Sequence, residues 1–340
     1  MNTYTLTNTI AAAASAVAFI TIPATTTGVT RVWKGGSNTW QTASCWMPTG
    51  VPDVGDDVVI TNGTVEYVAG SDLTRSGSTV IGAGGRFVQT GKDSWMQISG
   101  AVLMEDGGEL DMGTAGQINL SAPLIISNAI FTQSGKISIG STCSCTLAGG
   151  TWTQKNNSLT GPTYILSGTW TQTGGTASGP FYIRGGTVSF TSPSSHSGLF
   201  SISGGDVTFG GTGGKLTVDS NFEMTGGQIV LPGELQFSGT GHSLSGGVIK
   251  CTLVASQSNG SVLTLVGGNI IATGSFQGVP GLWQAGSSYF DFPPASTSSF
   301  TVAAELSAAA VYSTYFSGSS PKFCYDGNPL SETSFANLFD

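Results

Sequence analysis

Charged residues are scarce in this chain. Its 340 residues include 11 lysines and arginines and 19 aspartates and glutamates, for a formal net charge of −8. A basic surface that could neutralise phosphate groups is lacking, so we expect no nucleic-acid partner. Low Lys and Glu content with abundant Ser, Thr, Gly and Asn is typical of β proteins on virion or extracellular surfaces.

Side chains that bind metals are also few. The histidines are His196 and His242, and the five cysteines are Cys45, Cys143, Cys145, Cys251 and Cys324. No Cys-x-x-Cys pair or histidine cluster suggests zinc, and we expect no cofactor and no metal apart from a calcium alternative given below. The odd cysteine number excludes a complete intramolecular disulfide set. We interpret most of the cysteines as small buried residues, with Cys45 and Cys324 as the cross-link candidates.

We expect neither a secretory leader of the usual kind nor a membrane span near the N-terminus. Residues 10–22 are apolar, but no lysine or arginine precedes Arg31, whereas a secretory signal begins with a positive region. The run is also shorter than the roughly 20 residues of a spanning helix. We expect residues 1–30 to form an extended, threonine-rich arm that packs onto the rest of the chain, a neighbouring subunit or a larger assembly.

Glycine, by contrast, is abundant, with 51 residues, and it recurs at intervals averaging roughly 20 residues, which is typical of a solenoid. The recurring glycines, each preceded by Gly or Ser, are Gly85, Gly108, Gly135, Gly150, Gly168, Gly186, Gly205, Gly227, Gly247 and Gly268. Apolar residues alternate after each of them, which predicts strands with one inward face.

The alternation defines two inward positions per unit. The first holds Phe87, Leu110, Ile137, Trp152, Trp170, Val188, Val207, Ile229, Ile249 and Ile270. The second holds Gln89, Met112, Ile139, Gln154, Gln172, Phe190, Phe209, Leu231, Cys251 and Ala272. We predict an all-β fold, a single-stranded right-handed parallel β-helix of about ten coils with N- and C-terminal caps. The alternative, a β-sandwich or barrel, would favour Asn-Gly or Asp-Gly hairpin turns over the Ser/Thr-Gly-Gly turns that dominate here.

Four parts are expected along the chain. They are the arm at 1–30, a tryptophan-rich N-terminal cap with the first coils at 31–80, the β-helix at 81–280, and a C-terminal cap or oligomerisation or docking region at 281–340. The repeats fade near residue 275, and the prolines at 293 and 294 mark a boundary.

The opening segment of the repeat region has a distinctive composition. Residues 33–60 read WKGGSNTWQTASCWMPTGVPDVGDDVVI, with three tryptophans, a proline turn and a first strand. This segment resembles the entry segment of secreted bacterial right-handed parallel β-helix proteins, including autotransporter-type adhesins. The resemblance covers about 30 residues and extends loosely through the Gly-Gly coils. It implies a β-helix fold and a surface role of the adhesin or phage-spike kind.

Trp33, Trp40 and Trp46 have two interpretations. They provide apolar area to cover the open end of a solenoid, or they form an aromatic cluster that binds glycan. We favour the cap and keep the three as glycan-binding candidates. Asp56 and Asp57, which follow the turn, are expected to have a turn role.

The densest acidic cluster is the segment from Glu105 to Asp111. Glu109 and Asp111 alternate with Leu110 and share one strand face near Glu105 and Asp106. Paired carboxylates of this kind serve glycoside hydrolysis or hold calcium, whereas a solvated corner needs no further role. We favour the solvated corner, with these four residues as weak catalytic candidates and calcium as the metal alternative.

Threonines form a second pattern in the middle coils. Thr151 and Thr153, Thr169 and Thr171, Thr187 and Ser189, and Asp206 and Thr208 occupy equivalent outward positions. Flat Thr-x-Thr ladders resemble those of ice-binding β-solenoids, although threonine is favoured on exposed strands in general.

The C-terminal region is rich in aromatic residues. We expect them to form a cap or to serve assembly, and the assembly candidates are Tyr289, Phe290, Phe292, Tyr312, Tyr315 and Phe316. Resemblance to phage spikes implies a homo-oligomer, with a trimer as the specific expectation.

The favoured function is a non-enzymatic structural or adhesive protein of a virion (a spike, fibre or capsid-associated protein) or of a cell surface. Its expected partners are other virion or surface proteins and a cell-surface glycan. The alternatives are a polysaccharide-degrading hydrolase or lyase of the tailspike kind, and an ice-binding solenoid.

Overall fold

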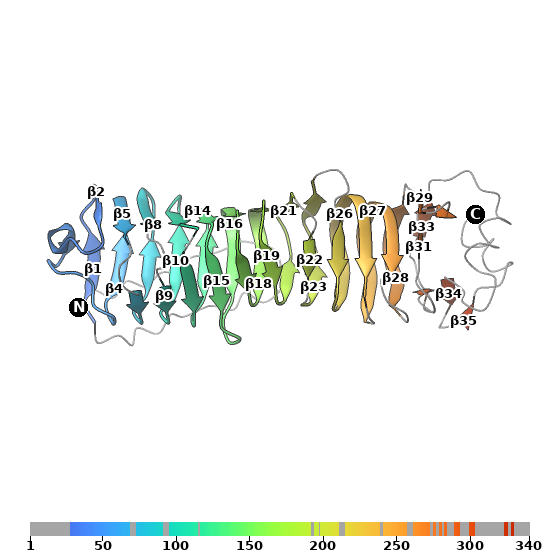
Figure 1. The fold of residues 1–340 in the computed structure, drawn as a ribbon, viewed down its shortest axis with the longest axis horizontal. Coiled ribbons are helices and arrows are strands. Elements are labelled where there is room, and N and C mark those ends of the chain that lie inside the picture. The colour runs from blue at the N-terminus through green and yellow to red at the C-terminus, as the bar shows by residue number, and fades with distance from the viewer. Residues whose placement is uncertain are drawn as a thin grey trace.

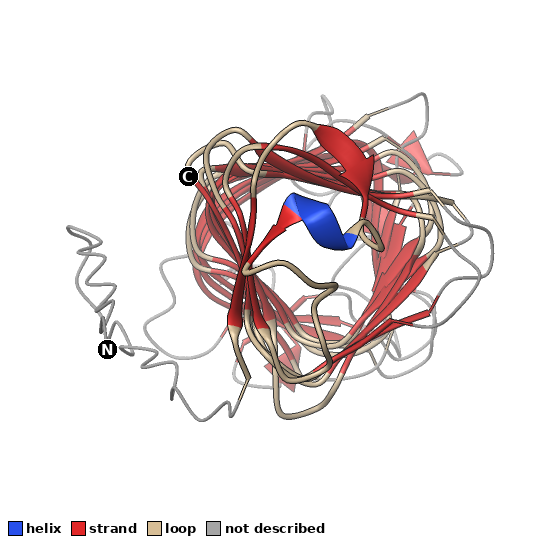
Figure 2. Cartoon of the chain, turned by 90° about the vertical axis from the view of Figure 1, so that its left-hand side faces the viewer, coloured by secondary structure: helices blue, strands red, loops and turns tan. Residues whose placement is uncertain are grey.

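The computed structural model is a long coil of short β-strands, stacked turn on turn (Figure 1). It describes residues 28–68, 73–90, 95–114, 116–191, 194–196, 198–210, 215–238, 241–256, 261–272, 275–276, 279–280, 282–283, 289–292, 299–302, 323–325 and 328–329. Seen end-on, the strands form a ring (Figure 2). The fold is an all-β solenoid of about nine turns, which confirms the predicted parallel β-helix.

Each turn places strands on three faces. The first face holds β1 (Thr30–Trp33), β4 (Asp57–Ile60), β7 (Thr79–Ile81), β10 (Val102–Glu105), β13 (Leu124–Ser127), β20 (Phe181–Ile183), β23 (Phe200–Ile202) and β32 (Tyr289–Phe292). The second holds β2 (Ser37–Thr39), β5 (Gly63–Tyr67), β8 (Gly85–Gln89), β11 (Glu109–Met112), β14 (Ala129–Gln133), β21 (Thr187–Phe190), β24 (Asp206–Phe209) and β33 (Ser299–Val302). The third holds β6 (Leu73–Arg75), β9 (Trp95–Ile98), β12 (Gln117–Leu120), β15 (Lys136–Ile139), β17 (Ser158–Thr160), β19 (Thr176–Ser178), β22 (Ser194–His196), β25 (Leu216–Val218) and β31 (Leu282–Trp283).

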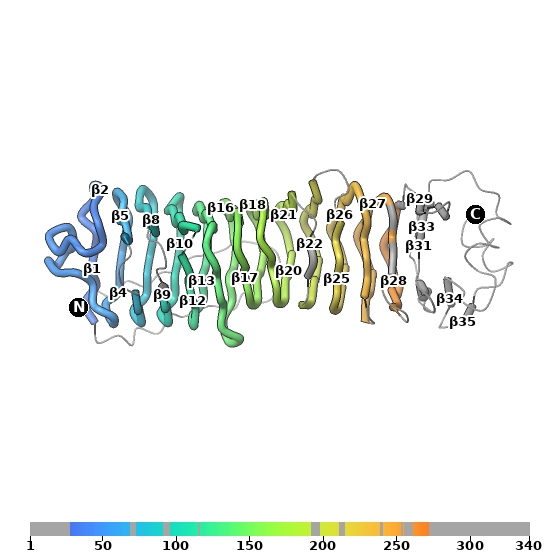
Figure 3. Tube along the Cα trace, in the orientation of Figure 1, coloured from blue at the N-terminus to red at the C-terminus, as the bar shows by residue number. Residues whose placement is uncertain are grey.

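Five longer strands run around corners from one face to the next, and Figure 3 follows this path along the chain. They are β16 (Cys145–Gln154), β18 (Thr163–Gln172), β26 (Phe222–Phe237), β27 (His242–Ser256) and β28 (Val262–Ala272). The remaining elements are the 3-10 helix η1 (Ala43–Cys45), β3 (Trp46–Met47), β29 (Ser275–Phe276), β30 (Val279–Pro280), β34 (Phe323–Tyr325) and β35 (Asn328–Pro329). Among the described strands, only β1–β3, β29–β30 and β34–β35 pair antiparallel.

Parallel pairing continues past residue 275, where the repeat pattern fades in the sequence. Strand β28 pairs with β32 and with β33, and β32 pairs in turn with β34. The coil therefore extends beyond the last Gly-Gly corner, because main-chain hydrogen bonding between turns does not require a Gly-Gly corner at each turn.

The predicted interior stacks are largely confirmed by the strand register. On the second face Phe87 pairs with Leu110, and the row continues through Trp152, Trp170, Val188, Val207, Ile229, Ile249 and Ile270. These side chains are buried and belong to one continuous core. The stacking is aromatic in part, with Phe190 and Phe209 parallel at 4.5 Å between ring centroids.

One turn was assigned wrongly from the sequence. Phe131, and not Ile137, occupies the first inward position between Leu110 and Trp152, and Gln133 takes the position predicted for Ile139. Ile137 and Ile139 lie on the third face, in β15. The corner of this turn is Asn128-Ala129, in which Asn128 adopts a φ of 53°. Asparagine tolerates the left-handed region, so the corner needs no glycine.

The corrected register reveals a buried row of glutamines. Gln89, Gln133, Gln154 and Gln172 are at most 2% exposed, and the last three stack on consecutive turns. The side-chain amides of Gln133, Gln154 and Gln172 donate to main-chain oxygens of the following bend. Gln154 Nε2, for example, donates to Asn157 O at 3.2 Å and also to Thr176 O, on the next turn, at 3.1 Å. The buried amide nitrogens of these glutamines thereby find hydrogen-bond acceptors inside the coil.

A polar network fixes the first turn. The Asp56 carboxylate accepts hydrogen bonds from Arg31 Nε at 2.9 Å, Val29 N at 2.8 Å and Asp53 N at 3.0 Å. The guanidinium of Arg75, only 2% exposed, donates to the main-chain oxygens of Asp53 and Asp56. Burial alone raises the pKa of Asp56, but the hydrogen bonds from Arg31, Asp53 and Val29 outweigh it and leave the pKa below its ordinary value. The expected turn role of Asp56 is thus confirmed.

Glycine corners hold neighbouring turns close together. Seven successive corners have positive φ, between 75° and 88°, at Gly150, Gly168, Gly186, Gly205, Gly227, Gly247 and Gly268. A Cβ added at Gly205 would lie 2.6 Å from the carbonyl oxygen of Gly186 on the preceding turn, so both the backbone conformation and the space require glycine there.

We predict that Gly205→Ala lowers the thermal unfolding midpoint, measured by circular dichroism, more than Gly107→Ala does. Both positions have positive φ, which costs roughly 1–2 kcal/mol for alanine. Only at Gly205 would the added Cβ also collide with the preceding turn, because a Cβ at Gly107 would meet nothing within 4 Å. Equal effects of the two substitutions would contradict the close approach of the turns.

A second prediction concerns acid. Because the folded pKa of Asp56 is lowered, its contribution to stability is present above the unfolded pKa, near 3.8, and is lost as the pH falls through the folded value. Asp56→Asn should therefore destabilise the protein at pH 7, by about 2–4 kcal/mol, with a difference from wild type that shrinks toward pH 3. Asp206→Asn, at an exposed position, is the control and should be nearly neutral. A penalty for Asp56→Asn that is constant with pH would refute the assignment.

Candidate functional site

The acidic cluster lies on the outer surface, where the structure pairs two of its members with an arginine. Glu109 and Asp111 project outward from β11, and Arg86 projects from β8 on the preceding turn. The guanidinium contacts Glu109 at 3.2 Å and Asp111 at 3.1 Å, and all three side chains are about two-fifths exposed. Both carboxylates are therefore compensated by one cation, an arrangement that keeps a charged corner soluble.

Glu105 and Asp106 form the other half of the cluster, at the corner between β10 and β11. Asp106 has a φ of 49° and is exposed, while burial, followed by the charge of Asp106, raises the pKa of Glu105. The structure brings Glu105 next to Asp106, and Glu109 next to Asp111 through Arg86. Within the described part of the chain no group of three or more His, Cys, Asp or Glu side chains is arranged to hold a metal ion.

The three tryptophans are packed together at the N-terminal end. Trp33 and Trp46 have centroids 4.9 Å apart, Trp40 and Trp46 5.0 Å apart, and the three side chains are at most 4% exposed. Helix η1 lies within the outline of the ring at this end (Figure 2). This corrects the glycan-binding alternative for these residues, because buried rings offer no face to a sugar. Their packing matches the predicted capping role.

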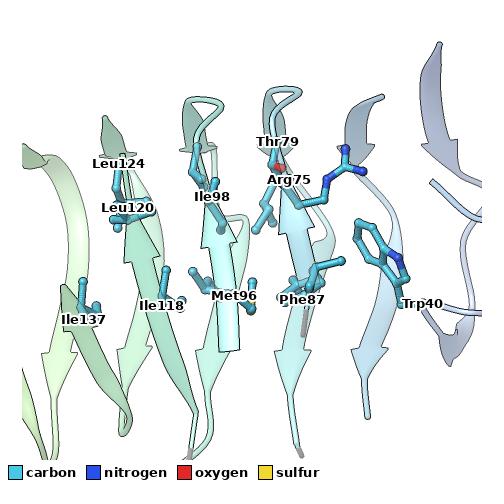
Figure 4. Close-up of a pocket in the computed structure, with 14 residues that line it drawn as sticks. Trp40, Arg75, Thr79, Phe87, Met96, Ile98, Ile118, Leu120, Leu124 and Ile137 are labelled. Carbon is cyan, nitrogen blue, oxygen red and sulfur yellow. The ribbon is translucent and has the colours of Figure 1, made fainter. Parts of the chain in front are cut away.

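A small cavity lies inside the first turns. It has a volume of about 30 Å³ and an almost entirely apolar lining that includes Phe87, Met96 and Ile118, with Arg75 and Trp40 toward the N-terminal end (Figure 4). A space of this size holds about one water molecule, and a bound water needs two or more polar partners. The cavity is therefore a packing defect and not a ligand site.

Three cysteines, Cys143, Cys145 and Cys251, and the side chain of His242 are buried among core residues. Burial raises the pKa of Cys143 and Cys145, and that of Cys251 to about 12, which disfavours the reactive thiolate at neutral pH. Cys45 is partly buried. His242 is 1% exposed and packs against Phe237 at 4.9 Å. Of His196, in β22, and Cys324, in β34, the structure describes the backbone alone.

The C-terminal assembly candidates cannot be placed as side chains. Tyr289, Phe290 and Phe292 belong to β32, of which the structure describes the backbone alone, and Tyr312, Tyr315 and Phe316 fall outside the described residues. The same holds for most of the arm at 1–30.

The threonine rows are in register, as predicted. Thr151, Thr169 and Thr187 are paired across three turns, and Thr153, Thr171 and Ser189 run beside them. Thr208 follows Ser189 in the second row, as predicted, and the row is one member longer than the sequence suggested, since Thr132 precedes Thr153. Ile130 and Asp206 bound the first row at its two ends.

Sequence reasoning missed an aromatic pair on the first face. Tyr164 and Tyr182 project outward from adjacent turns, with rings stacked at 4.6 Å between centroids and 7° between planes. The guanidinium of Arg184 lies over the Tyr164 ring, 5.6 Å from its centroid. Each tyrosine stands four residues before a corner glycine, so a comparison of equivalent positions between repeats would have found the pair.

Comparison with known proteins gives no relative. No protein-family model matches the chain, and no curated protein or solved structure matches it. Among the residues described, none forms a helix able to cross a lipid bilayer.

Proposed function

We propose that the chain is a non-enzymatic structural or adhesive rod of a virion or cell surface whose side wall contacts glycan. The observation that supports this best is the difference in chemistry between the inward and the outward side chains. Inward rows from Trp33 to Ile270 fill a continuous core, whereas the outward rows of the middle turns carry mainly hydroxyl groups. A wall of this kind binds by hydrogen bonds and van der Waals contact and has few ionisable groups for chemistry.

The mechanical part of the proposal follows from the strand pairing. Each turn is hydrogen-bonded to its neighbours along the three faces, and aromatic side chains stack from turn to turn inside, as Phe181 and Phe200 do at 6.0 Å. An axial stack of this type is stiff, since bending must break pairing on one side. We further propose that the rod assembles as a homo-oligomer, with a trimer as the specific expectation, together with other virion or surface proteins.

Sedimentation velocity and light scattering on the full chain test the assembly. We expect a particle of about three times the 34.5 kDa chain mass with the high frictional ratio of a rod, and retention on glycan-coated beads. A compact monomer that no immobilised glycan retains would overturn the proposal.

The enzymatic alternative makes a separate prediction. A variant with Glu105→Gln, Asp106→Asn, Glu109→Gln and Asp111→Asn should fold, because exposed ion pairs contribute only about 0–1 kcal/mol each. Incubated with polysaccharide, it and the wild type should release the same background of reducing ends. Reducing ends released by the wild type but not by the variant would establish a hydrolase, whereas unsaturated products would indicate a lyase.

Ice binding is the other alternative function, and the threonine rows favour it. They present two parallel lines of hydroxyl and methyl groups at strand spacing. Thermal hysteresis in the wild type that disappears in Thr171→Lys would support this function, and its absence in the wild type would exclude it.

A further inference from the structure

The outward row of the first face changes character along the rod. In successive turns it holds Thr146, Tyr164, Tyr182, Ser201 and Glu223. The two tyrosines cover each other's facing sides, but the opposite side of the Tyr182 ring faces the position of Ser201. A small side chain thus follows a large planar one, and a charged side chain follows on the next turn.

The spacing of the turns sets the width of this interruption. Neighbouring strands lie about 4.8 Å apart, so the positions of Tyr182 and Glu223, two turns apart, are separated by roughly 9–10 Å. A flat ring in van der Waals contact needs about 3.5–4 Å to the atoms on each side. The gap above Ser201 therefore accepts one ring and not two. We call the surface formed by Tyr182, Ser201 and Glu223 the Ser201 recess.

The floor of the recess is rigid. On the inner side of the same strands Phe181, Phe200 and Phe222 stack on consecutive turns, with centroids 6.0 Å and 6.4 Å apart, and all are at most 2% exposed. Tyr182 and Ser201 are partly buried, and Glu223 is exposed. The distance between the two walls is therefore fixed by the core and does not depend on a loop.

The side chains around the recess define the chemistry of its occupant. The face of Tyr182 is electron-rich and favours polarised C–H groups or cations. The Glu223 carboxylate accepts hydrogen bonds, and Ser201, with Ser203 and Thr225 on the neighbouring row, both donates and accepts. The guanidinium of Arg184 lies over the Tyr164 ring, on the side of Tyr182 away from Ser201, so the charged group at the recess is the Glu223 carboxylate, which disfavours an anionic sugar. A flat ring with one C–H face and hydroxyls at its edge meets these groups.

We propose that the Ser201 recess binds a single neutral pyranose ring of a glycan, stacked on Tyr182 and hydrogen-bonded at its edge to Glu223 and Ser201. This inference rests on the proposed function, glycan contact by the side wall, and locates that contact at the Ser201 recess. Burial, followed by the charges of Tyr164 and Glu223, raises the pKa of Tyr182, although Arg184 opposes this shift. The phenol is therefore neutral at physiological pH and its ring remains available for stacking.

Saturation-transfer NMR on the full chain tests the site, with the methyl β-pyranosides of glucose, galactose and N-acetylglucosamine as probes. We expect transfer to the C–H face of at least one probe. Ser201→Phe should abolish it by filling the recess, and Tyr182→Ala should weaken binding roughly tenfold, whereas Tyr182→Phe should keep it. Ser243→Phe, in the same row beyond Glu223, is the matched control and should bind as the wild type does.

Three results would overturn the inference. They are the absence of transfer to every probe, equal binding by Ser201→Phe and wild type, and equal loss in Ser201→Phe and Ser243→Phe. A fall in molar mass caused by Ser201→Phe would show that the recess holds a second protein chain instead. Binding to glycan-coated beads that survives Ser201→Phe would reject this site and leave the proposed function standing.

Discussion

Main-chain hydrogen bonding between successive turns is the constraint on which the rest of this structure depends. A strand in one turn finds partners only in the turns before and after it, and a shift by one residue would move its whole apolar set to the outer surface. Every turn must therefore keep the register of its neighbours. The corner glycines serve this requirement, because at Gly205 and its equivalents the backbone of the preceding turn occupies the space of a Cβ.

The same constraint explains which features the sequence predicts. Recurring glycine and alternating apolar residues specify parallel turns, and the inward rows follow because equivalent positions must stack. The error at Ile137 has the same origin. Glycine is not the only residue that makes a corner, because Asn128 makes the corner in that turn, whereas Gly135 precedes a strand of a different face. A sequence rule that accepts asparagine as well as glycine at the corner, because both tolerate the left-handed backbone conformation, places Phe131 and Gln133 correctly.

The sites were harder to predict than the fold, because burial at the ends and exposure along the wall depend on contacts between distant turns. The tryptophans of the first turn resemble an aromatic platform in sequence, but the open end of a solenoid must be covered, and they cover it. Arg75 stands in a short strand with polar neighbours, as an exposed residue would, yet its guanidinium is buried against the main chain of Asp53 and Asp56. Nothing local to Arg75 in the sequence indicates these partners, which lie about twenty residues earlier.

A solenoid wall makes a binding site only where one of its rows is interrupted. In an uninterrupted row, side chains of equal size stand one strand spacing apart, and a ligand ring cannot enter between them. The threonine rows are of this kind and present a flat surface. A small residue between two large ones opens a gap two spacings wide, with walls fixed by the core beneath. The row Tyr164, Tyr182, Ser201, Glu223 is such an interruption in the described part of the wall, and it is recognised by comparing one position across successive turns and not by any contiguous motif.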